Sequence, residues 1–245
     1  LLKFCKYTRM LFYVGIFLCA GYSIFVTLSR NIKFNTLEKL DSEKAPRLIS
    51  TCDHAINTYS RRGFQVDEMF MDMQFNVLRE QLLLRYVKLN STSAKEHVGE
   101  IEQFIRVIKE RVHALYSRLP YKKLPRRITE AIVRHVCRWL NVFCPKNGIG
   151  GAISPRTLIT GVKLDFNSHC KIEIGAYAQV HEENIPTNDT AQFRTTGAIA
   201  LEHSDNLQGG YKFLSLTTGK ELDRRSFDIL PVTQDVIKRV HEMAA

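Results

Sequence analysis

Hydrophobic positions in the first half of the chain follow two periodicities. Short runs rich in aromatic and β-branched residues, which favour buried strands, alternate with longer segments whose apolar residues recur every three or four positions, as on one face of a helix. The pattern predicts three strands, a helix, a strand, a helix, a strand and a helix. The expected segments, in that order, are 12–17, 24–26, 32–37, 42–59, 64–71, 74–85, 87–90 and 98–119. This order is typical of an α/β fold with a mixed sheet.

The segment 98–119 gives the strongest helical signal of the chain. Its apolar residues form a continuous stripe at helical spacing, made of Ile101, Ile105, Ile108, Val112, Leu115 and Leu119. A further helix is expected over 128–143, with Pro145 just beyond its end.

The second half of the chain has a different pattern. Ser154-Pro155 resembles a helix N-cap followed by proline at the first helical position, and Gly161 would end that short helix. Short alternating runs then follow at 175–181, 196–201, 211–216 and 221–227, divided by Gly- and Asn-rich turns. Their spacing predicts a small all-β barrel. The expected organisation is therefore a core over 1–150, a connecting helix and linker over 151–170, a β domain over 171–230 and a linker tail over 231–245.

The uncharged run 11–28 admits two interpretations. Lys3, Lys6 and Arg9 precede it, which is typical of a membrane anchor, and its length just reaches that of a spanning helix. However, its aromatic and β-branched residues lie on both sides of a turn-like segment, 20–23, as in two strands joined by a tight turn. The strand interpretation is preferred, and a membrane anchor stays open as the alternative.

Charge and cysteine content narrow the function class. The formal net charge is +10 and the pI is about 9.4, which suits a polyanionic partner such as nucleic acid, although a merely basic surface explains the charge equally well. Six cysteines occur without a Cys-x-x-Cys pair, so a zinc site is not expected and reduced intracellular thiols are the default. The first residue is Leu1 rather than Met, which suggests a fragment or a processed product.

Two carboxylates stand where metal-dependent chemistry could use them. Asp72 follows an apolar strand, and Glu102 lies in the first turns of the strongest helix. Mg²⁺ prefers oxygen ligands, and carboxylates from a strand end and a nearby helix commonly assemble such a site. Taken alone, the residues fit better with structural roles, a strand-end aspartate and an ion pair between Glu102 and Arg106.

The surroundings of these two acids resemble motifs of the integrases of copia-type retroelements. Residues 71–75 (Met-Asp-Met-Gln-Phe) are similar to the second-acid motif, and 102–110 to the third-acid helix. The separation, 102 − 72 = 30 residues, is close to that of the family. Further similar segments are 25–34, 139–141, 145–148, 154–156 and 175–227, the last resembling the SH3-like domain that follows the core.

This resemblance implies a fold and an activity. The expected fold is a ribonuclease-H-like mixed sheet (βββαβαβα) followed by a small all-β SH3-like barrel. The implied reaction is DNA integration by strand transfer, in which a cDNA 3′-hydroxyl attacks a phosphodiester of target DNA with Mg²⁺ or Mn²⁺. The implied partners are element cDNA ends, target DNA and further copies of the chain, with no small-molecule substrate. The implied location is intracellular, in the nucleus or a virus-like particle.

One departure from the family matters more than the matches. Counting back from Phe25, the family's first-strand aspartate should fall at Gly15. Asp67 lies five residues before Asp72, and in a regular strand this odd separation places it on the opposite face. The chain is therefore interpreted as an integrase remnant, with Asp72 and Glu102 as the remaining catalytic and metal-binding residues and with activity lost.

Basic residues near these elements are candidates for nucleic-acid contact. Arg106 and Lys109 share a helical face with Glu102 and would meet phosphates beside it. Four further cations, Lys122, Lys123, Arg126 and Arg127, cluster in one turn, as is typical of backbone-phosphate binding. The alternative to an integrase remnant is therefore a non-enzymatic nucleic-acid-binding protein that uses the same basic residues.

Overall fold

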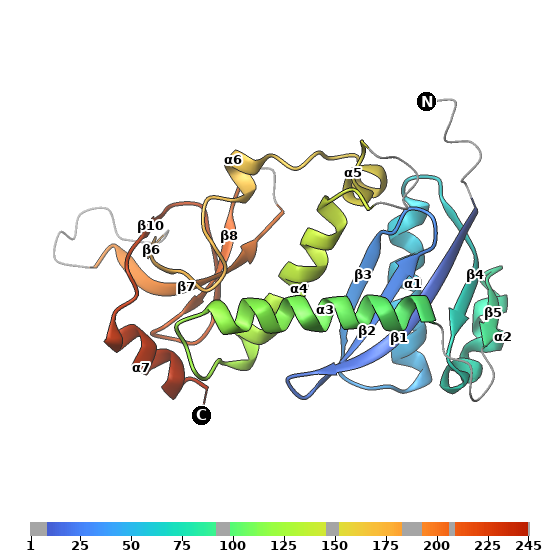
Figure 1. Ribbon diagram of the computed structural model, residues 1–245, viewed down its shortest axis with the longest axis horizontal. Helices are drawn as coiled ribbons and strands as arrows, with labels where there is room; N and C mark the ends of the chain where they lie inside the picture. The colour runs from blue at the N-terminus through green and yellow to red at the C-terminus, as the bar shows by residue number, and fades with distance from the viewer. Residues whose placement is uncertain (1–8, 92–98, 146–151, 183–192, 206–208, 245) are drawn as a thin grey trace. The chain divides into compact units, whose positions relative to one another are not determined.

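The chain divides into two compact units in its computed structural model, which describes residues 9–91, 99–145, 152–182, 193–205 and 209–244 (Figure 1). Unit 1 comprises Leu1–Glu110 with Val136–Lys163, and unit 2 comprises Arg111–His135 with Leu164–Ala245. Two helices, α3 (Gly99–Arg118) and α4 (Arg126–Val142), have residues in both units. Val98, where the helix 98–119 was expected to begin, lies outside the described residues.

Unit 1 is built on a five-stranded mixed sheet with the strand order β3-β2-β1-β4-β5. Its strands are β1 (Arg9–Cys19), β2 (Tyr22–Ser29), β3 (Asn35–Leu40), β4 (Gln65–Met71) and β5 (Lys88–Ser91). The first three pair antiparallel, whereas β4 pairs parallel to β1 and β5 parallel to β4. This order and these directions are those of a ribonuclease-H-like sheet, so the predicted α/β fold class is confirmed.

The segment 11–28 forms two antiparallel strands, as the strand interpretation predicts. Gly15 pairs with Val26 in their register. Ala20 and Gly21, with φ of 50° and 79°, make the turn between β1 and β2. Positive φ at both central residues is the geometry that matches the right-handed twist of the two flanking strands. Within the described part of the chain, no helix is long and apolar enough to cross a membrane.

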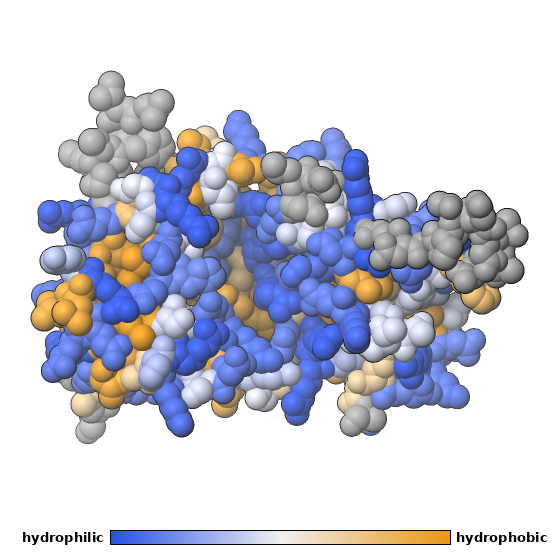
Figure 2. All heavy atoms as spheres, turned by 180° about the vertical axis from the view of Figure 1, so that it is seen from behind, coloured by the Kyte–Doolittle hydropathy of each residue, from blue (hydrophilic) through white to orange (hydrophobic). Residues whose placement is uncertain are grey.

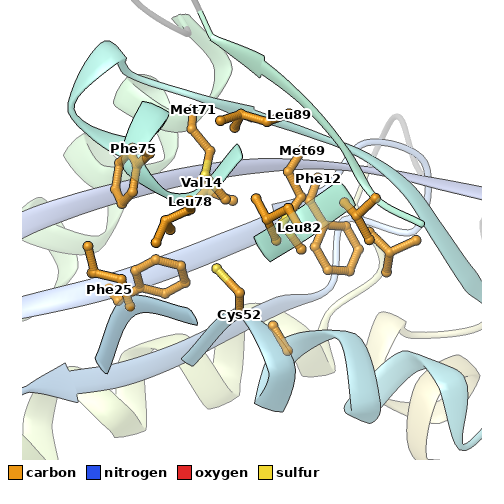
Figure 3. Close-up of a cluster of buried hydrophobic side chains, with 14 of the residues drawn as sticks. Phe12, Val14, Phe25, Cys52, Met69, Met71, Phe75, Leu78, Leu82 and Leu89 are labelled. Carbon is orange, nitrogen blue, oxygen red and sulfur yellow. The ribbon is translucent and has the colours of Figure 1, made fainter. Parts of the chain in front are cut away.

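The core of unit 1 lies on one face of the sheet. Helix α1 (Ala45–Ser60) packs there, and the Phe12 and Tyr59 rings are 4.5 Å apart. Figure 3 shows the Cys52 side chain pointing from α1 into a cluster of apolar side chains drawn from β1, β2, β4, β5 and the segment after β4. Burial of each large apolar side chain contributes about 1.5–3 kcal/mol, which makes this cluster the main stabilising feature of the unit.

The expected helix 74–85 is two shorter elements. A 3-10 helix, Met73–Leu78, is followed by α2 (Arg79–Leu83). Phe75 and Leu78, both fully buried, are three residues apart, and a 3-10 helix places residues at that spacing on one side. The packing of these two residues on the sheet therefore outweighs the preference for one continuous α-helix. Later in unit 1, α5 (Pro155–Thr160) is capped as predicted, since Ser154 Oγ accepts from Thr157 N–H at 3.2 Å.

Unit 2 contains a second five-stranded sheet, which is antiparallel. Its order is β10-β6-β7-β8-β9, and its strands are β6 (Tyr177–His181), β7 (Thr195–His203), β8 (Tyr211–Ser215), β9 (Glu221–Arg224) and β10 (Phe227–Ile229). Ala178, Val180, Ala198, Ala200 and Phe213 form its core.

The predicted barrel is wrong in one respect, because this second sheet is not closed in the part of unit 2 that the structure describes. The expected strand 221–227 is interrupted after Arg224, and its two halves lie at opposite edges. There β9 pairs with β8, and β10 pairs with β6. The link from Arg224 to Phe227 spans at most about 11 Å, so the two edges of the sheet must come close together there. Strand periodicity alone does not reveal this.

Two short helices accompany the second sheet, α6 (Phe166–His169) and α7 (Gln234–Glu242). The latter occupies the expected linker tail. Thr233 caps it by accepting from Val236 N–H at 3.4 Å, and both Val236 and Val240 are buried. Burial of these two valines at i,i+4 explains why the weak helical pattern there forms an ordered helix.

Candidate functional site

Asp72 lies at the carboxyl end of β4, directly beside the middle of β1. The parallel register pairs Tyr13 with Phe70, an offset of 70 − 13 = 57 residues. The pairing ends there, and the same offset continued by two residues would set Gly15 opposite Asp72, since 72 − 15 = 57. Asp72 itself ends the strand, because its carbonyl accepts from Phe75 N–H at 3.0 Å and opens the 3-10 helix. Its side chain makes no capping hydrogen bond, which leaves the carboxylate available at this edge of the sheet.

Helix α3 covers the face of β1 opposite the one that packs against α1. Tyr13 donates from its hydroxyl to Glu100 Oε1 at 3.1 Å, and two strand positions on, a β carbon at Gly15 would lie 3.1 Å from Ile101 Cγ1. Two positions further, Lys109 Nζ is 5.8 Å from the centre of the Phe17 ring. Alternate residues of β1 thus face successive turns of α3, which Figure 1 shows crossing in front of the sheet.

Gly15 is therefore in direct contact with an apolar stripe. Besides Ile101 Cγ1, a β carbon there would lie 3.1 Å from Ile105 Cδ1, which is tighter than ordinary packing. Glu102 is the residue after Ile101 and is exposed on α3. The elements carrying Asp72 and Glu102 both border Gly15, as the sequence predicts, and the catalytic roles of these two acids stay a prediction.

A three-carboxylate metal centre does not fit the residues present. Asp72 and Glu102 offer the oxygen donors that Mg²⁺ or Mn²⁺ prefers, but position 15 supplies no donor and two isoleucine side chains crowd it. Asp67 does not replace it. It sits in the bulge of β4 opposite Met10 and Leu11, and its carboxylate is 3.5 Å from Arg9 Nε. The predicted orientation of Asp67, facing away from Asp72, assumed regular alternation along β4, and the bulge interrupts that alternation. Asp67 nevertheless lies several residues from Gly15 along β1.

Unit 2 contains a group of possible metal ligands that sequence reasoning missed. Nitrogen and oxygen atoms of His169, His203 and Asp205 lie within 4.8 Å of one another. However, the two imidazole rings are stacked with centroids 4.0 Å apart and an interplanar angle of 23°. In-plane lone pairs of stacked rings do not converge on one ion, and His203 Nδ1 already accepts from Asp205 N–H at 2.9 Å. We interpret the group as a stacked histidine pair rather than a metal centre.

The two basic candidates on α3 have partners of their own. Arg106 forms an ion pair with Glu110 at 3.8 Å, and Lys109 lies over the Phe17 ring. Both side chains are exposed, so phosphate contact remains a prediction for them.

The basic turn before α4 is exposed in the way that phosphate contact requires. Lys122, Lys123, Arg126 and Arg127 are all exposed. Figure 2 shows the molecule from behind, with more hydrophilic than hydrophobic surface in that view. Tyr121, in contrast, is buried and donates from its hydroxyl to Gly175 O at 3.0 Å. Burial raises the pKa of Tyr121 to about 12. Its role is to anchor the turn to the β6 side of unit 2, not to stack on a base.

Comparison with known proteins finds similarity among solved structures. No family model matches the chain, and no curated protein matches it. Among solved structures, the catalytic core domain of BIV integrase in crystal form I is similar, with 16% sequence identity and a TM-score of 0.45. The match covers 62% of this chain and 93% of that one. At this level of similarity the fold assignment rests on the strand order and directions of unit 1, and the function on the residues themselves.

Proposed function

We propose that this chain is a remnant of a retroelement integrase that binds nucleic acid without catalysing strand transfer. The observation that carries the proposal is the environment of Gly15. Gly15 lies on the strand that pairs with β4, two residues beyond Tyr13, the partner of Phe70. It packs against two isoleucines of the helix that carries Glu102. In this proposal Asp72 and Glu102 are two members of an acid triad, and Gly15 stands at the position of the third.

Loss of that member accounts for loss of activity. The reaction needs a nucleophile and a leaving group held and neutralised by metal ions, and each carboxylate contributes charge that fixes those ions. With position 15 apolar and Asp67 beside Arg9, only two of the three acid positions implied by the resemblance, Asp72 and Glu102, carry a carboxylate. Two carboxylates and an apolar wall are a poor site for a divalent-ion pair.

Nucleic-acid binding does not depend on the acids. The net charge of +10 attracts polyanions, and four exposed cations between 122 and 127 supply phosphate contacts. DNA as the partner, self-association, and a nuclear or virus-like-particle location belong to the same proposal. So do the copia-type origin and the SH3-like character of the second sheet, both supported by the motifs in 71–75, 102–110 and 175–227.

The test uses the purified full chain in two assays. In strand transfer with a cDNA-end oligonucleotide and Mg²⁺ or Mn²⁺, we expect no product. In fluorescence anisotropy with duplex DNA, we expect binding that weakens steeply with salt. Asp72→Asn is the matched control, because it removes an acid of the site and should leave the affinity for DNA unchanged. Metal-dependent product that Asp72→Asn abolishes would show an active enzyme and overturn the proposal, as would absence of DNA binding at low salt.

A further inference from the structure

Unit 2 contains an open cleft of about 640 Å³ beside the start of α4. Its walls include Arg126 and Arg127 from that helix, Arg239 from α7, and Thr217, Thr218 and Gly219 from the turn between β8 and β9. We call these six residues and the space between them the arginine cleft. Cavities of 300–1,000 Å³ are typical of ligand sites, so the space is adequate for a nucleotide or a short stretch of backbone.

Hydrogen bonds hold two of the arginines against the walls. Arg127 donates from NH1 to Gly219 O at 2.8 Å, and Arg239 donates from Nε to Leu216 O at 2.8 Å. Both acceptors belong to the turn between β8 and β9. Each guanidinium has five N–H donors, so one such bond fixes its orientation and leaves donors for a ligand.

A further hydrogen bond connects the segment before α4 to α7. Lys122 N–H donates to His241 Nε2 at 3.0 Å, which joins the basic turn to α7. Arg127 and Arg239 therefore occupy a frame in which turn, helix and strand connection are mutually bonded. A site held by such contacts loses less side-chain freedom when a ligand binds than free surface arginines do.

The lining indicates the chemistry of the ligand. Three guanidinium groups and two threonine hydroxyls line the cleft, and none of its described lining residues is acidic. Arg239 Nη1 is 3.3 Å from Glu242 Oε2 in an exposed ion pair. Guanidinium forks bind phosphate in bidentate fashion, hydroxyls donate to its oxygens, and the first residues of α4 add the positive end of a helix dipole.

We infer that the arginine cleft is a phosphate-ester binding site through which unit 2 holds nucleic acid. This inference rests on the proposed nucleic-acid binding and assigns it to one place, distinct from the Asp72 and Glu102 region of unit 1. The phosphate could belong to the backbone of a strand or to its 5′ end, and the chemistry of recognition is the same for both.

The main experiment compares two double variants of the full chain. Arg127→Gln with Arg239→Gln removes two cleft charges, whereas Arg111→Gln with Arg118→Gln removes two charges from the exposed face of α3 in the same unit. In anisotropy titrations with duplex DNA, the cleft variant should lower the slope of log K against log salt by about 2 and weaken binding at least about tenfold. The α3 variant should keep most of the slope. Equal effects of the two variants would overturn the inference while leaving nucleic-acid binding intact.

A second pair of measurements covers misfolding and the source of the phosphate. Arg127→Lys with Arg239→Lys keeps the charge but loses the fork, and should bind with an affinity between wild type and the Gln variant. Wild-type affinity in this Lys variant would contradict bidentate binding of the phosphate by the two guanidinium groups. Thermal unfolding should show a rise in Tm with a nucleoside monophosphate for wild type and none for the Gln variant. Equal rises in Tm for wild type and the Gln variant would contradict phosphate binding in the arginine cleft. Oligonucleotides with and without a 5′ phosphate separate end binding, which needs that group, from backbone binding, which does not.

If wild type fails to bind DNA at all, the proposed function fails. The cleft is then judged by the nucleoside monophosphate alone, since a Tm rise restricted to wild type supports a phosphate site and its absence refutes one.

Discussion

Gly15 and Ile101 are in such close contact that a single added carbon on the strand would lie 3.1 Å from the isoleucine Cγ1. The contact joins the middle of β1 to the first turns of α3. Helix and strand approach this closely because glycine has no side chain at the contact. The glycine is thus part of the packing of unit 1, in addition to being the position of a missing acid.

Substitution of Gly15 should therefore destabilise the fold. For Gly15→Ala we expect a loss of about 1–3 kcal/mol in the free energy of unfolding, because overpacking outweighs the gain of about 0.4–1 kcal/mol that alanine brings by restricting the unfolded chain. Urea unfolding followed by far-UV circular dichroism measures this. Gly99→Ala is the control, since nothing lies within 4 Å of a β carbon there. It should be neutral or slightly stabilising, and equal costs for both variants would refute the close contact.

Gly15→Asp should fail to restore strand transfer. Its carboxylate would be directed at the apolar side chains of Ile101 and Ile105, which offer it no hydrogen bond, so the variant should be less stable than Gly15→Ala. Adding Ile101→Ala and Ile105→Ala should recover part of the stability lost in Gly15→Asp. Product from Gly15→Asp alone, at wild-type stability, would show that α3 can move aside.

The link between α4 and the edge of the first sheet gives a third prediction. Asn141 Oδ1 accepts from Asn35 N–H at 2.8 Å, and Asn141 Nδ2 donates to Asn35 O at 2.8 Å. Both residues are buried, so Asn141→Ala would leave backbone groups of β3 without partners and should cost at least about 2 kcal/mol in unfolding free energy. Asn57→Ala, on the exposed side of α1, should change it by less than about 0.5 kcal/mol. A small effect at position 141 would mean that α4 is not anchored through this pair.

Alkaline pH should weaken unit 1 through Cys52. Burial, helped by the charge of Asp53, raises the pKa of this thiol from 9.0 to about 12. The unfolded chain therefore loses this proton near pH 9 while the folded chain keeps it, so stability is intact below pH 9 and falls as pH rises toward 12. The expected slope from this group is about 1.4 kcal/mol per pH unit. Urea unfolding between pH 8 and 11 should show a shallower decline for Cys52→Ala. Parallel declines would contradict the assignment, because the raised pKa of Tyr59 acts in both proteins.

Thiol labelling tests the surroundings of Cys170 in unit 2. Partial burial, followed by the negative charge of Asp165, raises the pKa of the Cys170 thiol. Asp165→Asn keeps a side chain that can cap α6 but removes the charge, so Cys170 should react faster with a thiol reagent at pH 8. Cys144, exposed in unit 1, serves as the internal control, and its rate should not change. Mass spectrometry of labelled peptides separates the two rates.

The parts of the fold that follow local rules were predictable from sequence. Aromatic and β-branched runs located β1, β2 and β4, a turn with positive φ at Ala20 and Gly21 joined the first two, and the stripe from Ile101 located α3. The resemblance assigned Gly15 to the first strand and Asp72 to the end of the fourth, and the structure has Gly15 in β1 and Asp72 directly after β4.

Other features depend on contacts between distant segments, which periodicity does not encode. The 3-10 helix over 73–78 forms because Phe75 and Leu78 both pack on the sheet, and the break after Arg224 becomes visible only once β9 and β10 pair at opposite edges. His169 and His203 carry no shared motif, so nothing in the sequence signalled their stacking. The approach of Ile105 to Gly15 depends on the rotation of α3 about its own axis, which an apolar stripe fixes only coarsely.

The isoleucine contact also bears on the history of the chain. A missing acid would ordinarily be one codon change away from return. Here an aspartate at position 15 would contact isoleucine side chains that pack closely against glycine. The substitution would therefore lower the stability of the fold before it could raise activity. Under the proposed origin, return is easiest when Ile101 and Ile105 change together with Gly15. The packing around Gly15 then makes the proposed loss of the carboxylate hard to reverse by a single substitution.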